Sequence, residues 1–380
     1  MRLRLATFNI ENLFTRFDFS AFTNARSAKY LPPVVQFLGD FSDGDFTKFE
    51  AFKRQLETAA ISQDDDRRQH TALAFAEADA DIYALQEVDS ADALTRFMNA
   101  YVKKIGVDKY DQIIVQEGND FRGIDVGAIA RDIRPVYSRS HATKTGGWLK
   151  KTDSGKALLT AYPEAAKALK NKIKRNRIFR RDCLELETRI QNSSGTIDKT
   201  VSIFVCHFKS MSGGRAKSLG TRQLEASTVR EIITRKFANQ PDALWAVMGD
   251  LNDYRQTITI RKTKDANGAF IEEIKALTAN EPSGVDPLLD DGFGINTLNA
   301  LPPEERWTHY YAAQRHKTQL DYIIASPALA AMVSGQPRVI RSGMPFRLLN
   351  SDDIKRYPRI GWDRPKASDH CPLVVEFDIR

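Results

Sequence analysis

The chain has 380 residues, of which 42% are hydrophobic and 28% are charged, and its formal net charge is +7. This composition is typical of a folded globular protein with a sizeable core and excludes a globally disordered chain. The sequence contains no stretch of about eighteen apolar residues, so it does not predict a membrane-spanning helix.

The start of the chain and its cysteines bear on the compartment. The first apolar run is short and is interrupted by Asn9 and Glu11, so it does not read as a secretory signal. Cys183, Cys206 and Cys371 lack the spacing of a metal site, which is typical of reduced structural thiols. We therefore expect a cytoplasmic protein.

The predicted secondary structure alternates between strands and helices. Apolar runs predict strands over Leu3–Phe8, Ile82–Leu85, Val201–Cys206, Ala243–Met248, Tyr322–Ala325 and Leu373–Phe377. Apolar spacing predicts helices over Thr71–Glu77, Ala91–Tyr101, Glu164–Lys174 and Thr221–Phe237. No linker divides the chain, so we expect one domain over residues 1–380 with insertions at about 14–66 and 138–180.

Positive charge is concentrated in the second insertion. The segment from Lys144 to Arg181 contains twelve Lys and Arg but only two Asp and Glu. Such a segment favours a polyanionic partner, either nucleic acid or an anionic membrane. The alternative is a solvated helix face.

Polar side chains gather at the ends of all six predicted strands. Four strands carry them at the C-terminal end: Asn9 with Glu11, Glu87, His207, and Asp250 with Asn252. Two strands carry them at the N-terminal end: Asp321, and Asp369 with His370. If these groups meet, the two sets of strands must run in opposite directions, which indicates mixed or antiparallel sheets.

These residue types fit one kind of chemistry. Carboxylate and amide oxygens are ligands for Mg²⁺ or Mn²⁺, and the remaining aspartates and histidines supply acid–base groups. Each residue alone is explained as an ordinary end of a strand. Together they predict a metal-bound phosphate attacked by an activated water.

Cations follow the third strand, in "HFKSMSGGRAKSLGTRQ". Lys209, Arg215 and Arg222, with the two glycines, could form a loop that contacts the substrate phosphate. The alternative is a turn that leads into a helix. Aromatic residues before Asp321 could stack on a base or belong to the core, and the sequence gives His309 no clear partner.

Six stretches together resemble the endonuclease/exonuclease/phosphatase superfamily, which includes pancreatic-type deoxyribonuclease and exonuclease III. They are "ATFNIENLF", "DIYALQEV", "VCHFKS", "MGDLND", "QLDYIIAS" and "SDHCPLVVEF", in the family's order. The resemblance implies an α/β (α+β) fold: a four-layer α/β/β/α sandwich of two mostly antiparallel mixed sheets flanked by helices.

The resemblance also implies a metal site for Mg²⁺, with Mn²⁺ as an alternative. Glu87 would be the direct carboxylate ligand, and Asn9 would join it. Glu11 matches a position that is often acidic in the family, which makes it a weaker candidate. Asp369 would assist at the metal.

The resemblance implies catalytic roles for five further residues. Asp250 would orient or deprotonate the attacking water, and Asn252 would hold both the phosphate and Asp250. His370 would contact the scissile phosphate, with Asp321 fixing its tautomer. His207 would bond a phosphate oxygen or protonate the leaving oxygen. The sequence leaves open whether Asp250 or His370 is the base.

The expected function is a divalent-metal-dependent phosphodiesterase acting on nucleic acid, DNA rather than RNA, as an endonuclease that leaves a free 3′-hydroxyl. One alternative is a phosphatase or a phospholipid or sphingomyelin-type phosphodiesterase of the same fold. "QLDYIIAS" argues against the inositol phosphatases, whereas "AKYLPPVVQFLGDF" keeps a lipid substrate open. A catalytically inactive binding module is the remaining alternative.

Overall fold

The computed structural model describes residues 1–13, 65–107, 110–120, 122–131, 135–170, 177–191, 198–268, 270–348 and 354–380. The predicted insertion at 14–66 therefore lies outside the described residues except for its last two positions. The end of the helix predicted over Glu164–Lys174 also lies outside them.

Six strands form the first sheet: β1 (Arg2–Leu13), β2 (Ile82–Val88), β3 (Gln112–Gln116), β4 (Asp125–Ala130), β15 (Arg338–Val339) and β16 (Leu373–Asp378). Their order is β15-β16-β1-β2-β4-β3. β1 pairs parallel with β2 and antiparallel with β16, so this sheet is mixed.

Six strands form the second sheet: β5 (Pro135–Ser140), β6 (Cys183–Gln191), β7 (Asp198–His207), β8 (Leu244–Asp250), β11 (Ile295–Asn296) and β14 (Asp321–Ala325). Their order is β11-β14-β8-β7-β6-β5. β8 pairs parallel with β7 and antiparallel with β14, so this sheet is mixed as well.

The two sheets pack face to face around a common apolar core. Leu5 and Ala84 of the first sheet and Ile203 and Met248 of the second belong to it, and all four are fully buried. Burial contributes about 25 cal/mol per Å² of apolar surface, so this core holds the sheets at a fixed separation. The strand ends that carry polar residues are thereby held in place.

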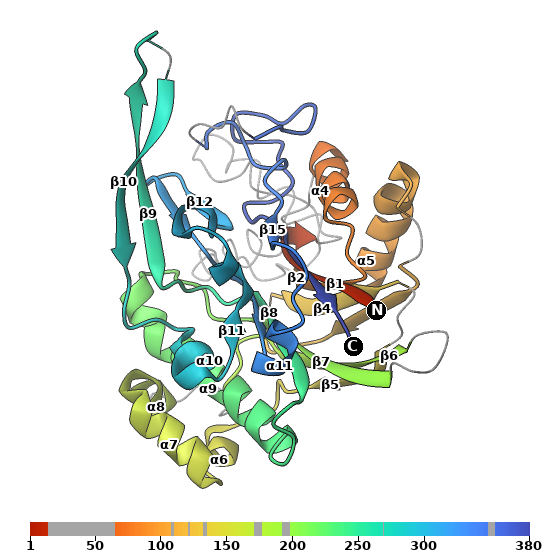
Figure 1. Ribbon diagram of the computed structural model, residues 1–380, viewed down its shortest axis with the longest axis vertical. Helices are drawn as coiled ribbons and strands as arrows, with labels where there is room; N and C mark the ends of the chain where they lie inside the picture. The colour runs from red at the N-terminus through yellow and green to blue at the C-terminus, as the bar shows by residue number, and fades with distance from the viewer. Residues whose placement is uncertain are drawn as a thin grey trace, which may run out of the picture.

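Helices cover the outer face of each sheet and complete four layers (Figure 1). On the first sheet lie α4 (Asp65–Ala78), α5 (Ala91–Phe97), the π-helical turn Met98–Val102 and the 3₁₀ turn Lys103–Ile105. With the second sheet lie α6 (Gly146–Leu149), α7 (Asp153–Ala161), α8 (Pro163–Lys170), α9 (Arg215–Lys236), α10 (Asp286–Leu289) and α11 (Pro327–Ala330). Further 3₁₀ turns are Asp290–Gly292, Thr297–Ala300 and Pro303–Glu305.

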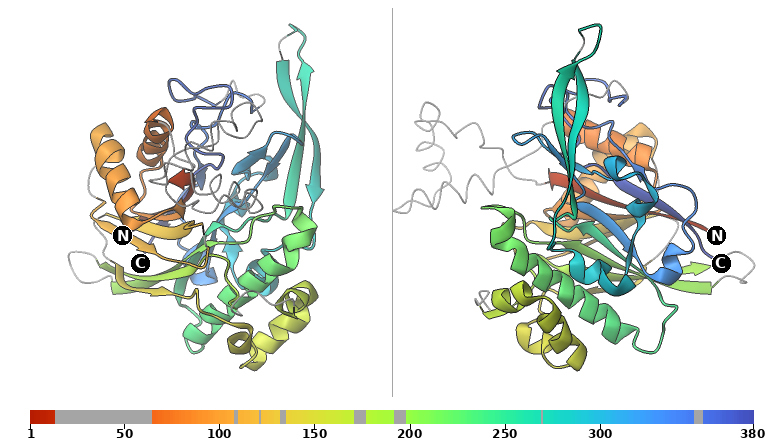
Figure 2. Two further views of the ribbon diagram at one scale, coloured as in Figure 1. Left: turned by 180° about the vertical axis from the view of Figure 1, so that it is seen from behind. Right: turned by 60° about the vertical axis from the view of Figure 1, so that its left-hand side comes forward.

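A smaller sheet that the sequence did not predict stands beside the sandwich. Its strands are β9 (Gln256–Lys264), β10 (Phe270–Ala279), β12 (His309–Tyr311) and β13 (His316–Thr318). The β9–β10 hairpin projects beyond the rest of the molecule in every view (Figures 1 and 2). This sheet is inserted between the motif of Asp250 and that of Asp321, and it brings β12 next to the strand ends.

The six predicted strands are confirmed as β1, β2, β7, β8, β14 and β16, and the four-layer sandwich is confirmed with them. The helix predicted over Thr221–Phe237 begins earlier, at Arg215. Gly213 and Gly214 precede it with φ values of 83° and 111°, which end the loop before the helix. Among the described residues, no helix has the length and apolar character needed to cross a membrane.

Candidate active site

The polar strand ends meet in one cleft of about 880 Å³. Its walls include Glu87, His207, Asp250, Asn252, His309, Asp369 and His370. The register explains this meeting, because Asp250 pairs with both His207 on β7 and Asp321 on β14. The inference that the two sets of strands run in opposite directions is thus confirmed.

The end of β8 holds the Asp250 carboxylate in a fixed position. Gly249 has a φ of 144°, and a Cβ there would lie 1.9 Å from the Cys206 carbonyl oxygen, so only glycine fits. Asn252 then donates to Asp250 from its backbone nitrogen at 2.9 Å and from its side-chain Nδ2 at 3.0 Å. Asn9 donates a further hydrogen bond from Nδ2 to Asp250 Oδ2 at 3.0 Å.

His370 lies between two aspartates. Its Nδ1 is 2.8 Å from Asp321 Oδ2, and its Nε2 is 3.7 Å from Asp250 Oδ2. Thr308 also donates its hydroxyl to Asp321, at 2.6 Å. Burial lowers the pKa of His370, but the charges of Asp321 and Asp250 outweigh burial and raise this pKa well above its usual value. His370 is therefore held in its charged form.

The pKa of His207 is shifted in the opposite direction to that of His370. It is buried at the end of β7, and its Nε2 is 3.5 Å from Asp250 Oδ2. Burial, together with the positive charges of Arg181 and His370, lowers the pKa of His207 well below its usual value. One imidazole of the cleft is thus charged and the other neutral.

The carboxylates of the cleft repel one another. Burial raises the pKa of Glu87 to about 7, and the negative charges of Asp369 and Asp250 contribute to this rise. Burial likewise raises the pKa of Asp250 to about 6, with a further contribution from Asp321. Such a set of buried oxygen ligands fits a divalent cation, because a cation would relieve this repulsion.

Two groups of residues could hold that cation. Glu87 and Asp369 offer the carboxylate oxygens. His309, Asp369 and His370 also place one ligand atom each within 4.8 Å of one another. Of these two imidazoles, His309 fits a ligand better, because burial and the charge of His370 lower its pKa to about 3 and keep it neutral.

Asn9 and Glu11 both have polar partners within the protein. The Nδ2 of Asn9 points at Asp250 and Glu87, and its Oδ1 accepts the Glu11 backbone N–H at 3.0 Å, so Asn9 positions the two carboxylates. Glu11 pairs with Arg67 at 3.3 Å and with Lys366 at 3.1 Å. Its φ is 47°, near the end of β1, and its role as a weaker metal ligand stays a prediction.

The three predicted substrate-binding cations differ in burial and in their partners. Arg222 is fully buried and pairs with Asp253 at 2.9 Å, so its prediction as a substrate contact is corrected. Arg215 lines the cleft but binds the same Asp253 at 2.6 Å. Lys209 turns its ammonium group to the carbonyl and hydroxyl oxygens of Ser210. Arg215 and Arg222 therefore brace the loop that follows Asn252.

Two other arginines line the cleft, and the sequence analysis missed both. Arg122 binds Asp120 at 2.7 and 2.9 Å, and Arg181 binds the same carboxylate at 3.2 Å. Arg181 also donates to the Phe208 carbonyl, next to His207. The positions of Arg122 and Arg181 in the sequence do not indicate that they lie close together. They do so because both bind Asp120.

His309 was also missed. It lies on β12, forms a bridge with His370, and places its ring 5.0 Å from that of His370. Of the neighbouring aromatics, Trp307 and Tyr310 are core residues, whereas Tyr311 is half-exposed and lines the cleft. The only signal in the sequence was the proximity of His309 to Asp321 along the chain.

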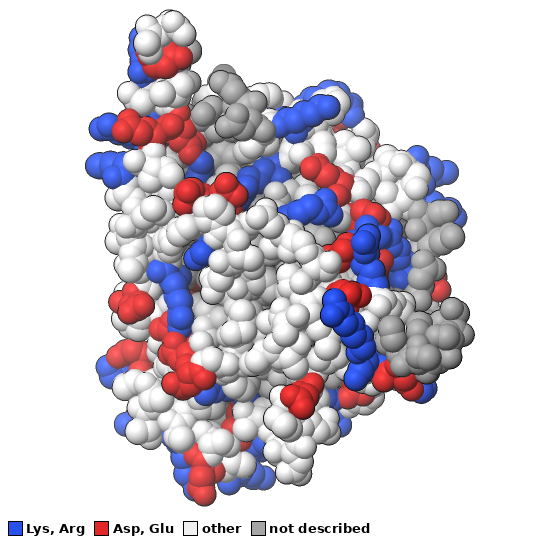
Figure 3. All heavy atoms as spheres, in the orientation of Figure 1, with Lys and Arg blue, Asp and Glu red and all other residues white. Residues whose placement is uncertain are grey.

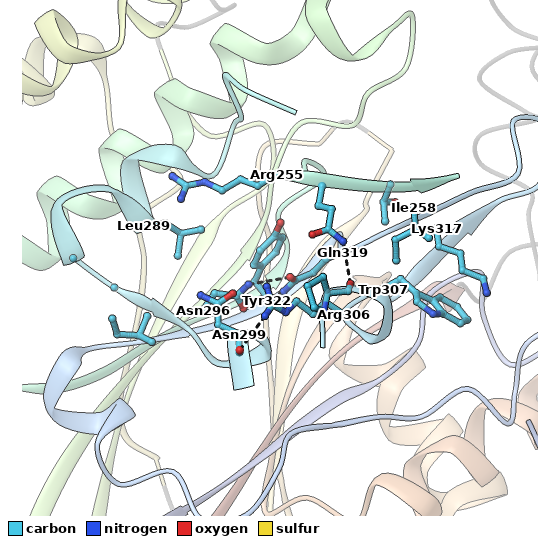
Figure 4. A pocket seen from close by; sticks show the side chains of 16 residues that line it. Arg255, Ile258, Leu289, Asn296, Asn299, Arg306, Trp307, Lys317, Gln319 and Tyr322 are labelled. Carbon is cyan, nitrogen blue, oxygen red and sulfur yellow. Dashed lines mark hydrogen bonds between the residues drawn. The ribbon is translucent and has the colours of Figure 1, made fainter. Parts of the chain in front are cut away.

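A second pocket, of about 310 Å³, shares Thr318 with the cleft. Figure 4 shows the side chains that line this pocket. We call it the amide pocket, because Gln256, Asn296, Asn299 and Gln319 line it. Asn296 and Gln319 exchange two hydrogen bonds, at 2.9 and 3.1 Å. Its polar groups thus find their partners within the protein.

Comparison with known proteins agrees with this geometry. A model described as the endonuclease/exonuclease/phosphatase family matches residues 160–288. No curated protein matches the chain by sequence. The catalytic domain of APE2 from Xenopus laevis has a TM-score of 0.50 at 12% identity, and the match covers 98% of this chain and 91% of that one.

Two further solved structures are similar. A mannosyl-6-phosphatase from Bacteroides thetaiotaomicron has a TM-score of 0.49 at 11% identity, with 98% of each chain covered. The catalytic domain of human Nocturnin has a TM-score of 0.47 at 13% identity, covering 100% of this chain and 95% of that one. The family model and the fold confirm the resemblance seen in the sequence, and identities this low carry no information on substrate.

Proposed function

We propose that this chain, which has the motifs and the fold of the endonuclease/exonuclease/phosphatase family, is a divalent-metal-dependent phosphodiesterase that cuts nucleic acid internally, with DNA as the preferred substrate. One observation carries the proposal. Asp250 is buried between the charged His370 and the neutral His207, and Glu87 and Asp369 lie beside it. This set of groups fits the in-line attack of water on a phosphodiester.

Asp250 fits the role of the base. A carboxylate with a pKa of about 6 can accept a proton near neutral pH, and three hydrogen bonds from Asn9 and Asn252 fix its direction. His370 already carries a proton, so it cannot accept the proton of the water. Its charge faces Asp250 and would stabilise the negative charge that develops on the phosphate.

The remaining residues fit the phosphate and the leaving group. When bound, a divalent cation held by Glu87 and Asp369 would neutralise the phosphate. Arg122 and Arg181 line the cleft and add positive charge. As the phosphorus–oxygen bond breaks, the departing 3′-oxygen takes a proton and leaves a free 3′-hydroxyl. Asn252 uses its N–H groups to hold Asp250 and the loop, so it supports the base.

Plasmid nicking tests the proposal. With Mg²⁺ or Mn²⁺ the wild-type chain should convert supercoiled plasmid to the open circle. EDTA should stop the reaction, and so should the double variant Asp250→Asn, His370→Ala. Lack of nicking by a folded, metal-binding wild-type chain would refute the proposal.

One observation favours a lipid phosphodiesterase as the second candidate. Phe346 and Trp362 lie on adjacent loop segments, joined by the backbone hydrogen bond from Arg347 to Trp362, and they are 49% and 68% exposed. Exposed aromatic side chains of this kind can insert at the surface of a membrane. If the plasmid is not cut, hydrolysis of sphingomyelin or phosphatidylcholine vesicles is the measurement that decides for this candidate.

A further inference from the structure

A groove of about 480 Å³ lies outside the cleft, between the edge of the second sheet and the end of α9. We call it the Trp148 groove. β5 supplies Arg139, the following segment supplies Lys144 and Trp148, β6 supplies Glu185, and α9 supplies Arg235 and Lys236. None of these residues belongs to the catalytic machinery described above.

Three cations crowd together in this groove. Lys144 Nζ and the Arg235 guanidinium lie 4.4 and 3.9 Å from the centre of the Trp148 ring. Burial lowers the pKa of Lys144, and the positive charges of Arg139 and Arg235 lower it further. The cations of the groove therefore lie close enough to repel one another.

The carboxylates of the groove do not balance Lys144 and Arg139. Glu185 binds His141 at 2.7 Å and Lys236 at 2.6 Å, and Glu187, which also lines the groove, pairs with the same Lys236. Arg235 binds Glu231 at 2.6 Å. Within the described parts of the chain, neither Lys144 nor Arg139 forms an ion pair. A bound anion would supply the missing partner.

The amide pocket differs from the Trp148 groove in how its cations are paired. There, Arg255 binds Asp286 at 2.8 Å and also contacts Asp290. Lys317 binds Glu272. Arg255 and Lys317 are thus paired with carboxylates, and Arg306, the other arginine of the amide pocket, donates to the Leu301 and Asn299 carbonyls. Lys144 and Arg139 of the Trp148 groove form no such ion pair in the described residues.

The groove is linked to the cleft through the backbone. Ile178 donates its N–H to the Lys144 carbonyl, and His141 donates its N–H to the Cys183 carbonyl. Helix α9 also connects the two sites, because Arg215 at its start lines the cleft and Arg235 near its end lines the groove. At a rise of about 1.5 Å per residue, the α9 segment between these two residues is about 30 Å long. A B-form duplex advances about 3.4 Å per base pair, so a duplex that reaches both sites needs about nine base pairs.

We propose that the Trp148 groove is a second phosphate-binding site, which holds the backbone of a nucleic-acid substrate at a distance from the phosphate in the cleft. This inference rests on the proposed function for the identity of its ligand. The chemistry required is that of a phosphate group bound by Lys144 and Arg139, with Arg235 beside them. A site of this kind positions a strand without reading its sequence.

Duplex length and salt provide the test. The double variant Arg139→Gln, Lys144→Gln is made in the Asp250→Asn chain, so that binding is measured without cleavage. A duplex of about twenty base pairs should bind about tenfold more weakly than to the Asp250→Asn parent. The slope of log K against log salt should become shallower by about 1.8, at about 0.9 per lost phosphate contact. A duplex of about five base pairs should bind equally to both.

A matched control separates local contact from net charge. The variant Lys150→Gln, Lys151→Gln removes the same two charges from exposed positions that do not line the groove. It should leave the binding of both duplexes nearly unchanged. Equal loss in the two double variants, or equal loss for the two duplex lengths, would overturn the inference. Unfolding temperatures show that each variant is folded.

Inorganic phosphate distinguishes failure of this inference from failure of the proposed function. If no duplex binds, phosphate at tens of millimolar is added to the wild-type chain and to the Arg139→Gln, Lys144→Gln chain. A rise in melting temperature in the wild type alone would support a phosphate site in the groove and refute nucleic acid as its ligand. An equal response in both chains would refute the site itself.

Discussion

The cleft and the amide pocket are neighbours that share Thr318, yet their polar groups are arranged in opposite ways. In the cleft, like charges face each other, and the pKa of Glu87 rises to about 7. In the amide pocket, Asn296 and Gln319 satisfy each other (Figure 4). A divalent cation would relieve the repulsion in the cleft, whereas the side-chain amides of Asn296 and Gln319 already have their partners.

Removing one charge from the cleft should have the largest effect. Asp250→Asn should lower kcat on a duplex substrate by a factor of about 10³, since general-base catalysis contributes roughly 10²–10⁴. Its effect on the free energy of unfolding should be small, because relief of the repulsion with Glu87 offsets the weakened contacts with Asn9, Asn252 and His370. Single-turnover cleavage and urea unfolding measure the two quantities.

Asp291→Asn is the matched control for that substitution. Asp291 makes only a distant pair with Arg230, at 3.4 Å, and is largely exposed. Its replacement should change neither kcat nor stability. A strong loss of stability in Asp250→Asn would show that Asp250 is a structural residue and would remove the contrast between the two pockets.

Replacing a buried cation outside both pockets should lower stability and leave substrate binding unchanged. Arg222→Leu leaves Asp253 buried with only Arg215 as a cation, and breaking a buried pair costs about 3–5 kcal/mol. Urea unfolding should show this loss. KM should stay unchanged in the fraction that remains folded, because Arg222 does not reach the cleft.

Arg261→Leu serves as the control for Arg222, since Arg261 forms an exposed pair with Glu273, at 2.8 Å. Its cost should stay below about 1 kcal/mol. A rise in KM for Arg222→Leu at unchanged stability would restore the earlier prediction that Arg222 contacts substrate.

These cases show why the sequence predicted some positions and not others. Asp250 and His370 follow or precede unbroken apolar runs, so the strand ends could be located and their meeting inferred. Glu11 lies two positions beyond Asn9, which suggests the same face of a strand, but its φ of 47° breaks that alternation. Arg222 lies on the buried face of α9, and its partner Asp253 is distant in sequence.

The missed residues share a different cause. His309 reaches the cleft only because β12 belongs to the small sheet, and three-residue strands leave little trace in a sequence. Arg122 and Arg181 meet through Asp120. Each of these positions depends on tertiary contacts, which no local pattern encodes.

The pH dependence of stability tests the repulsion in the cleft directly. The pKa values of Glu87 and Asp250 in the folded chain, about 7 and about 6, exceed their ordinary values of 4.5 and 3.8. The folded chain therefore binds more protons than the unfolded chain over this interval, and its stability falls as the pH rises through these values. Between pH 5 and pH 8 these two carboxyls alone should lower the stability of the metal-free protein by about 4 kcal/mol, since a difference of one in pKa is worth about 1.4 kcal/mol. His207 and His309 act in the opposite direction below pH 6.5, because burial lowers the pKa of both. The contribution of Glu87 is therefore the difference between the profiles of the wild type and of Glu87→Gln.

Mg²⁺ and substitution sharpen this test. Saturating Mg²⁺ should reduce the loss, because the cation favours the ionised carboxylates. Glu87→Gln should flatten the pH profile and abolish the stabilisation by Mg²⁺. Equal pH profiles of the wild type and Glu87→Gln in EDTA would show that burial and repulsion do not raise the pKa of Glu87.

The smallest effect is expected in the amide pocket. Gln319→Ala removes both hydrogen bonds with Asn296 and the one from Nε2 to the Asp321 carbonyl, at 3.2 Å. The loss in the free energy of unfolding should be about 1 kcal/mol, and kcat should stay within a factor of about two. A fall in kcat of tenfold or more would mean that Gln319 positions Asp321, and through it His370. The amide pocket would then be part of the catalytic apparatus, and the contrast with the cleft would no longer hold.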